Sequence, residues 1–137
     1  MSITFINDFQ KQVFKILSED DQISASVSKI YFGAVQDGKC PFLLISIQKA
    51  EELSLHVAQI YSVEFKISAY AKDHHHSLLV SLADRVVFVL NNTEILFDNY
   101  SVSGIKANQI TFEKAKDLVL NKLSISYKAL IKRKNDE

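Results

Sequence analysis

The sequence predicts an α+β domain in which two main helices pack on one face of a mainly antiparallel sheet of about five strands. Two segments carry apolar residues at helical spacing, and two others alternate apolar and polar residues as half-buried strands do. The links between successive strands are short, which favours antiparallel pairing. We therefore expect a single domain over residues 1–137, with an ordered core over about residues 4–131 and a charged, frayed tail over residues 132–137.

The first helix is expected over about residues 4–18, where Ser2 or Thr4 can accept the free amide hydrogens of the first turn. Its apolar residues recur at helical spacing and are Phe5, Ile6, Phe9, Val13, Ile16 and Leu17. Because Asp8 and two lysines interrupt this pattern, the segment lacks the hydrophobic centre of a signal peptide. We expect the chain to be made inside the cell and to keep this segment.

The next predicted elements lead from a short helical turn into two strands. Residues 20–21, both Asp, can cap that turn, and a strand-like run follows over residues 29–34. Residues 36–39 are the clearest turn signal in the chain. Pro41 has no amide hydrogen, which suits the first position of a strand, and the strand after it is predicted over residues 42–48.

Two long strands are predicted over residues 57–69 and 118–131, where the alternation is cleanest. The residues expected to face the core are Val57, Tyr61, Val63, Phe65, Ile67 and Ala69 in the first, and Val119, Leu123, Ile125, Tyr127, Ala129 and Ile131 in the second. The intervening Ser, Lys and Glu residues are expected to form a solvated face. Residues 100–106 and 109–112 are predicted to be two further extended segments.

The second helix is predicted to begin at an Asp73 cap and to end near Asn91. Its buried stripe is expected to be Leu79, Leu82, Ala83, Val86 and Leu90. Val80, Val87, Phe88 and Val89 lie off that stripe, so the helix needs cover on more than one side. This excess of apolar residues indicates self-association.

The composition excludes several classes of protein. The chain is 47% hydrophobic and 23% charged, with three Gly and one Pro, which is typical of an ordinary globular protein. Basic and acidic residues balance at 16 each, so no net field attracts the chain to nucleic acid or to an anionic membrane. The longest apolar stretch, residues 78–90, is interrupted by charged residues and is too short to cross a bilayer.

Residues that could carry chemistry do not form a site in the sequence. His74, His75 and His76 are adjacent, and consecutive side chains on a helix point about 100° apart, so they cannot converge on one metal ion. We expect them to be exposed residues at a helix start. Cys40, the single cysteine, lacks a neighbouring base and is expected to be semi-buried.

Other motifs of catalysis and cofactor binding are also missing. The three glycines, at positions 33, 38 and 104, are too far apart to build a phosphate-binding loop, and no serine lies in a glycine-flanked elbow. The carboxylates at residues 20–21, 51–52, 113 and 117 are interpreted as solvated turn residues. The sequence therefore predicts no catalytic residue, no metal site and no cofactor, and a protein that is not an enzyme.

One candidate contact surface is left. Residues 50–56 carry Leu53 and Leu55 between charged residues, and apolar side chains on an exposed loop often mark a protein contact. A loop folded back over the core would carry the same residues, so both interpretations stay open. The candidate interface residues are Leu53, Leu55, Val80, Val87 and Phe88.

The order of several segments resembles one known family. Residues 29–31, Lys-Ile-Tyr, are similar to the start of that family's first strand, and residues 41–46 to its proline-led second strand. Residues 61–70 resemble a long strand that ends in an aromatic residue just before a helix, which residues 79–90 match. Residues 123–131 resemble the final strand. The family is that of the small tail-completion, or tail-terminator, proteins of long-tailed bacteriophages, prophages and gene transfer agents.

The resemblance implies a structural virion protein without chemistry or cofactor. Members form rings, expected here to be hexamers, that cap the head-proximal end of a tail tube, end its polymerisation and provide the head attachment surface. The implied partners are copies of the chain itself, the tail tube protein and a head-completion or connector protein, without sequence-specific nucleic acid or membrane. The implied location is the tail of a virion, after synthesis in the host bacterial cytoplasm.

A ring requires two different complementary patches on each subunit. Our hypothesis is that the segment with Leu53 and Leu55 supplies one patch and the outer face of the second helix the other. Two other functions stay open. A head-to-tail joining or adaptor protein would share the size and the neutral charge, and a small ligand-binding or enzymatic α+β domain would need a concave pocket with convergent polar groups.

Overall fold

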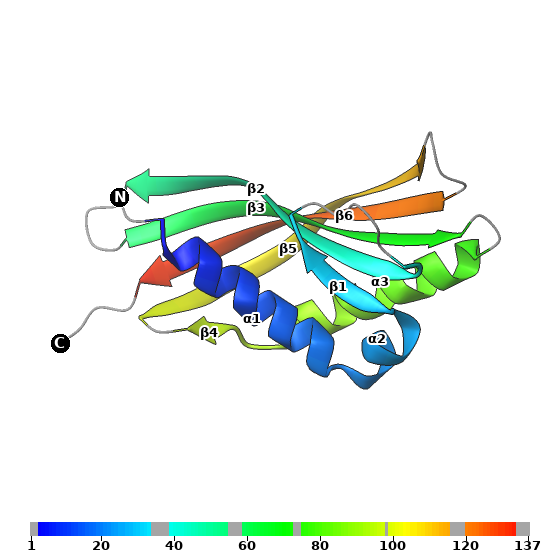
Figure 1. Ribbon diagram of the computed structural model, residues 1–137. Helices are drawn as coiled ribbons and strands as arrows, with labels where there is room; N and C mark the ends of the chain where they lie inside the picture. Colours follow the sequence, from blue (N-terminus) through cyan, green and yellow to red (C-terminus); the bar gives the residue numbers. More distant parts are fainter. Residues whose placement is uncertain are drawn as a thin grey trace.

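The computed structural model describes residues 3–33, 39–54, 59–72, 75–97, 99–115 and 120–133. In chain order the elements are α1 (Phe5–Glu19), α2 (Asp21–Ser26), β1 (Lys29–Phe32), β2 (Phe42–Ser54), β3 (Gln59–Lys72), α3 (His76–Asn91), β4 (Leu96–Phe97), β5 (Tyr100–Ala115) and β6 (Leu120–Arg133). The strands form one mixed sheet with the order β1-β2-β3-β6-β5-β4. The helices gather along one side of this twisted sheet (Figure 1). The α+β class with helices on one face is therefore confirmed.

Helix α1 confirms the first predicted helix. Thr4 is at its N-cap position, but the Thr4 side chain makes no capping hydrogen bond, and Ser2 lies outside the described residues. It ends where Asp20 adopts an extended backbone. The buried stripe of α1 is Phe5, Phe9, Val13 and Leu17. Phe9 meets the edge of Phe65 on β3, with ring centroids 5.3 Å apart, and Phe5 lies 4.5 Å from Tyr61. These aromatic contacts fix α1 against the sheet, since edge and tilted ring pairs add to the energy of burial.

Strands β3 and β6 form the centre of the sheet and confirm the two clean alternations. They pair antiparallel along their whole length, with Phe65 opposite Tyr127. The two rings stack 5.0 Å apart, and both side chains are buried. The residues predicted to face the core are buried wherever the structure describes them; Val57 and Val119 lie outside the described residues.

The expectation of a fully solvated opposite face was wrong at three serines. Ser62, Ser68 and Ser124 are buried, although they alternate with the core residues. Ser68 lies between Leu44 and Ser124 on the flanking strands, and the two serine hydroxyls are 2.9 Å apart. A short side chain in the middle of a twisted sheet is shielded by its longer neighbours.

The sheet is not wholly antiparallel, because β1 and β2 are parallel, with Ile30 opposite Leu43. Parallel neighbours need a connection long enough to return along the strand. β1 has only four residues, so the connection to the start of β2 must span only about 13 Å. The amide of Ser28 donates to the carbonyl of Pro41 at 2.7 Å and joins the two strand starts. Of the predicted turn at residues 36–39, only Lys39 is among the described residues.

Strand β2 is longer than the predicted strand over residues 42–48 and continues to Ser54. A bulge at Gln48 shifts its register against β3 between Ile47 and Lys49. Because the extra residue reverses the alternation, the charged residues after it resemble a loop in the sequence. The predicted loop over residues 50–56 is therefore wrong for residues 50–54, and Leu53 lies in a strand opposite Ile60.

Strand β5 joins the two extended segments that were predicted separately. Bulges at Ser103 and Asn108 shift its register against β6, so the alternation restarts twice within one strand. The short β4 pairs with the first residues of β5 and was not predicted, because two residues are too few to show a pattern. The sheet thus has six strands in the described residues rather than about five.

Helix α3 begins at His76, with His75 at the N-cap, which is later than predicted; Asp73 and His74 lie outside the described residues. The predicted stripe is confirmed, since Leu79, Leu82, Ala83, Val86 and Leu90 are all buried. Val89 is also buried. None of the helices in the described ranges is both long enough and apolar enough to span a bilayer.

Strand β6 extends two residues past the expected end of the ordered core. Lys132 is opposite Ile60 on β3 and Ser101 on β5, and Arg133 is opposite Tyr100. Of the residues expected to fray, Lys132 is therefore held in the sheet by both neighbouring strands and Arg133 by β5. Residues 134–137 lie outside the described residues.

Candidate interaction surfaces

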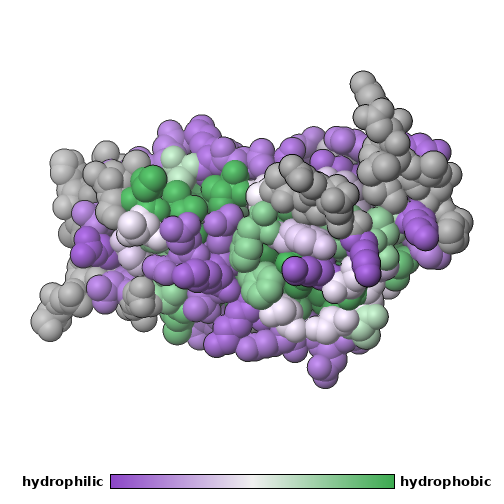
Figure 2. Space-filling view, in the orientation of Figure 1, coloured by the Kyte–Doolittle hydropathy of each residue, from purple (hydrophilic) through white to green (hydrophobic). Residues whose placement is uncertain are grey.

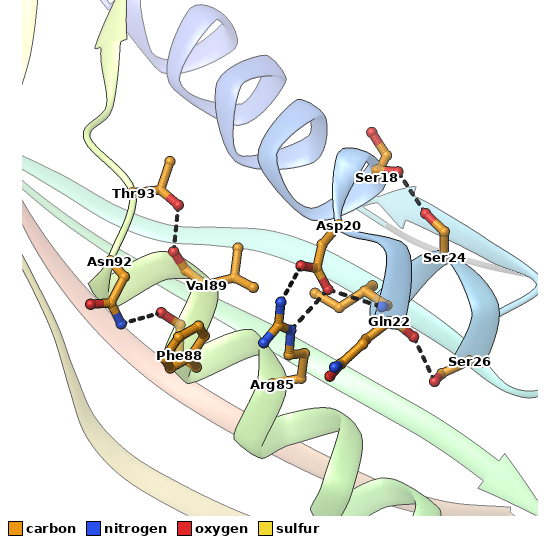
Figure 3. A network of polar contacts seen from close by, with 11 residues as sticks. Ser18, Asp20, Gln22, Ser24, Ser26, Arg85, Phe88, Val89, Asn92 and Thr93 are labelled. Carbon is orange, nitrogen blue, oxygen red and sulfur yellow. Dashed lines mark hydrogen bonds and ion pairs between the residues drawn. The ribbon is translucent and has the colours of Figure 1, made fainter.

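Asp20 and Arg85 form an ion pair that joins the α1–α2 corner to α3 (Figure 3). The Arg85 guanidinium donates to both carboxylate oxygens, at 2.7 Å from Nη2 and 3.1 Å from Nε. The Asp20 side chain also accepts the Ile23 amide hydrogen at 3.1 Å and so caps α2. The expected capping role is confirmed. The interpretation of Asp20 as a solvated turn residue was wrong, because α3 brings a guanidinium against it.

The charges of Asp20 and Arg85 stabilise the fold. The hydrogen bond from the Arg85 side chain lowers the pKa of Asp20 below its ordinary value, and the Ile23 amide acts in the same direction, against a smaller opposing effect of burial. Asp20 in turn raises the pKa of Arg85 through the same hydrogen bond. Each group therefore favours the charged form of the other. Neither is poised to transfer a proton.

The five predicted interface residues do not form one surface. Leu53 is 36% exposed near the end of β2, on the face of the sheet away from the helices, and Leu55 lies outside the described residues. Val80 and Phe88 are exposed on α3, at 45% and 54%. Val87 is only half-buried and packs against the core. The structure thus gives two separate candidate patches, one on β2 and one on α3.

The ring of Phe88 is in contact with the Arg85 side chain. The Arg85 guanidinium carbon lies 4.9 Å from the centre of the Phe88 ring, while the same group binds Asp20 (Figure 3). A cation over an aromatic ring is attracted to the ring face. The other face of the ring is available to a partner, since more than half of the side chain is exposed.

Two exposed apolar residues on β5 were missed in the sequence. Ile110 and Phe112 are 54% and 56% exposed, and they lie on the helix side of the sheet, opposite Ile125 and Leu123 of β6. The His76 ring of α3 stacks on Phe112, with centroids 5.5 Å apart. Because Ile110 and Phe112 are two positions apart, the sequence already indicated that they lie on the same face of a strand. The sequence did not show that α3 leaves this end of β5 uncovered.

Hydrophobic residues are also visible beside α1. In the space-filling view, green patches lie over the part of the sheet where β2 runs, among purple polar residues (Figure 2). Ile47 and Ala50, on the helix side of β2, are half-buried against the core. Apolar surface at an edge of a sheet is typical of a protein contact.

A shallow hollow of about 280 Å³ lies on the open face of the sheet. It is lined by Gln48, Glu64, Phe65, Lys66, Asn108, Gln109, Ser126 and Tyr127. The two bulge residues, Gln48 and Asn108, thus border the same hollow from β2 and β5. Its charged residues, Glu64 and Lys66, lie two positions apart on β3.

The histidines at the start of α3 and the single cysteine lie where the sequence predicted, as far as they are among the described residues. His75 and His76 are exposed at the start of α3. Cys40 is half-buried, and burial raises the pKa of its thiol, which disfavours the reactive thiolate. Within the described ranges, no group of three His, Cys, Asp or Glu side chains could hold a metal ion.

Comparison with known proteins identifies the fold. One chain of a solved structure, titled "Virion of native gene transfer agent (GTA) particle", superimposes with a TM-score of 0.79 over 96% of this chain and 99% of that chain. The two sequences are 13% identical, so the likeness concerns the fold. No protein-family model matches the sequence, and no curated protein matches it.

Proposed function

We propose that this chain is a structural component of a phage-like virion, and that it forms a ring at the head-proximal end of a tail tube. The observation that carries the proposal is the fold shared with a chain of a gene transfer agent virion over nearly the full length of both chains. The order of segments in the sequence independently favours the tail-terminator family.

The proposed mechanism is assembly. The ring ends polymerisation of the tube because its outer surface differs from that of a tube subunit, and the same surface receives the filled head. A ring closes through head-to-tail contacts, so each copy must present two different patches. We propose that Leu53, with Leu55, belongs to one of them, and that Val80, Val87 and Phe88 belong to the other.

The first test is the native mass of the purified protein. Light scattering and native mass spectrometry are expected to show a closed oligomer, most simply a hexamer. The double variant Leu53→Asp, Leu55→Asp is expected to reduce the mass, because two buried carboxylates would oppose the contact. Leu130→Asp is the matched control, since Leu130 is 37% exposed and Leu53 is 36% exposed. An unchanged mass in the double variant would exclude the Leu53 patch.

The second test is the position of the protein in the particle. Antibody labelling and electron microscopy of virions are expected to place it at the junction between tail and head. Label over the head, or the absence of the protein from purified particles, would overturn the proposal. If particles made without the protein have tails of normal length, and the label lies on the head side of the junction, the result would instead favour a joining or adaptor role.

A further inference from the structure

The sheet has two long edges that no described strand covers. β1 pairs only with Phe42–Ile45 of β2, and none of the described strands lies beside Ser46 to Ser54 on that side. At the other end of the sheet, β4 pairs only with Tyr100 and Ser101 of β5. The Val102 amide still donates to the carbonyl of Ile95, so the free edge of β5 begins at Ser103 and runs to Ala115. Figure 1 shows both strands extending past their short neighbours.

Free edges of this length are unusual, because exposed backbone N–H and C=O groups invite pairing with another chain. Each edge has bulges, but each also has an uninterrupted stretch beyond the last bulge. These stretches are Lys49–Ser54 on β2 and Gln109–Ala115 on β5. Each is long enough to form a regular strand pair.

We propose that the free edge of β5 in one copy pairs antiparallel with the free edge of β2 in the next copy, which joins the copies into one continuous sheet. The proposal deepens the proposed ring, because it names the surfaces by which the ring closes. The two edges are different surfaces, so the contact is head-to-tail, as a closed ring requires.

The strand directions support this pairing. β2, β3, β6 and β5 are successive antiparallel neighbours, so β2 and β5 run in opposite directions. A rotation about an axis inclined to the strands, as in a closed barrel, therefore brings a β2 strand beside a β5 strand of opposite direction and offsets the two copies along the strands. Each copy contributes four long strands to the continuous sheet. The alternation of directions passes from copy to copy without a break.

The charges of the two edges are complementary. Residues 46–54 contain one lysine and two glutamates, and residues 103–115 contain two lysines and one glutamate. If Glu51 lies opposite Thr111, then Lys49 lies opposite Glu113 on the open face of the joined sheet. Opposite charges placed directly across a strand pair are stabilising.

The same register gives Phe112 an apolar partner. On the helix side, Phe112 then lies opposite Ala50 of the next copy, and Ile110 lies opposite Glu52. Phe112 and Ile110 are more than half exposed in the single copy, and the Phe112 ring stacks on His76 of α3. Val80 follows His76 by one helical turn, on the same side of α3. The exposed part of α3 and the β5 edge thus belong to one surface that a second copy would bury.

The decisive experiment uses the unaltered protein. In one copy, Lys49 and Glu113 are separated by three strand spacings across the sheet and about six residues along it, or about 25 Å. A zero-length carbodiimide crosslink between them can therefore form only between copies. Mass spectrometry is expected to detect the Lys49–Glu113 crosslink in the oligomer band. A crosslinked oligomer without it would exclude this register.

A cysteine pair tests the pairing separately from the charges. In a Cys40→Ser background, Glu51→Cys with Thr111→Cys is expected to give a ladder of disulfide-linked species that ends at the size of the ring. The control pair, Glu51→Cys with Asp21→Cys, uses an exposed position on α2 that lies on neither edge of the sheet, and it is expected to give no ladder. Circular dichroism checks that each variant is folded. Equal ladders in both, or no ladder in either, would overturn the pairing.

The outcomes also separate this inference from the proposed function. A ring of defined mass that lacks both crosslinks would exclude edge pairing and leave the virion role in place. Crosslinked rings of a protein that is absent from the junction of the particle would support edge pairing and exclude the tail role. A chain that stays monomeric at millimolar concentration, with no crosslink, would overturn edge pairing.

Discussion

Asp20 and Arg85 lie 65 positions apart in the sequence and meet through two hydrogen bonds, of 2.7 and 3.1 Å. The pair ties the corner between α1 and α2 to α3, and the same carboxylate caps α2. The Asp20 side chain is mostly shielded from solvent, with 12% of its surface exposed. The two helical segments on the sheet are therefore held together by one polar joint as well as by apolar packing.

Removing this joint is expected to destabilise the fold. Asp20→Ala loses the N-cap of α2, which by itself is worth about 1 kcal/mol of the free energy of unfolding. The Arg85 guanidinium also loses its partner. Asp21→Ala is the matched control, because Asp21 is exposed and the structure gives it no capping bond. Urea unfolding at pH 7 measures both; equal losses in the two variants would contradict a specific role for Asp20.

The same pair predicts how stability depends on pH. The pKa of Asp20 is lowered in the folded state from an ordinary value of 3.8. The unfolded state therefore takes up this proton first as the pH falls. The stabilisation from Asp20 is fully present above about pH 4 to 5 and is lost as the pH falls through the lower, folded-state pKa.

Arg85→Met should make this acid-side decrease shallower, because it removes the main cause of the lowered pKa. Unfolding free energies of the wild type and the variant, measured from pH 7 to pH 2, test the prediction. Parallel curves over that range would show that Arg85 does not set the titration of Asp20.

Tyr127 predicts a stabilising substitution. Its hydroxyl is buried and has no hydrogen-bond partner, and burial raises the pKa of the phenol. A buried donor without a partner costs about 1 to 3 kcal/mol. Tyr127→Phe keeps the ring stacked on Phe65 and removes this cost, so a gain of about 1 kcal/mol is expected in thermal or urea unfolding. Tyr127→Ala, which removes the ring as well, should lose about 3 to 5 kcal/mol. A destabilised Phe variant would show that the hydroxyl has a partner in solution.

Ser68 and Ser124 predict a non-additive pair. Their hydroxyls, 2.9 Å apart and both buried, satisfy each other across β3 and β6. Ser124→Ala leaves the Ser68 hydroxyl without this partner and is expected to cost about 1 kcal/mol. The double variant Ser68→Ala, Ser124→Ala removes both groups and should be close to neutral. A double-mutant cycle by urea unfolding tests this; additive losses would mean that the two hydroxyls are not coupled.

Patterns within one segment predicted the regular elements well. The helical stripes of α1 and α3 and the alternation of β3 and β6 extend over many residues, so each identifies its element and its buried face. The sequence analysis missed that β2 continues past Gln48 and that β5 is one strand rather than two. In both cases a bulge inserts one residue and reverses the alternation of apolar and polar residues. In both strands the break falls at a single residue, Gln48 in β2 and Asn108 in the middle of β5.

The candidate surfaces were predicted less completely. The exposure of Val80 and Phe88 followed from their places off the helical stripe, and the structure confirms it. Ile110 and Phe112 alternate as core residues do, so their exposure depends on where α3 ends relative to β5. The loop assigned to Leu53 was wrong, since hydrogen bonds to β3, which no local pattern shows, hold it in a strand.

The sequence by itself determined the helices, the long central strands and most of the residues that fill the core. It could do so because burial of one face imposes a period of 3.6 or 2 on the chain. The tertiary structure decided the parallel pairing of β1, the contact between Asp20 and Arg85, and the two free edges of the sheet. These features depend on residues that are far apart in the chain. The contacts that stabilise them are made with another segment, and the periodicity within one segment does not show which segment that is.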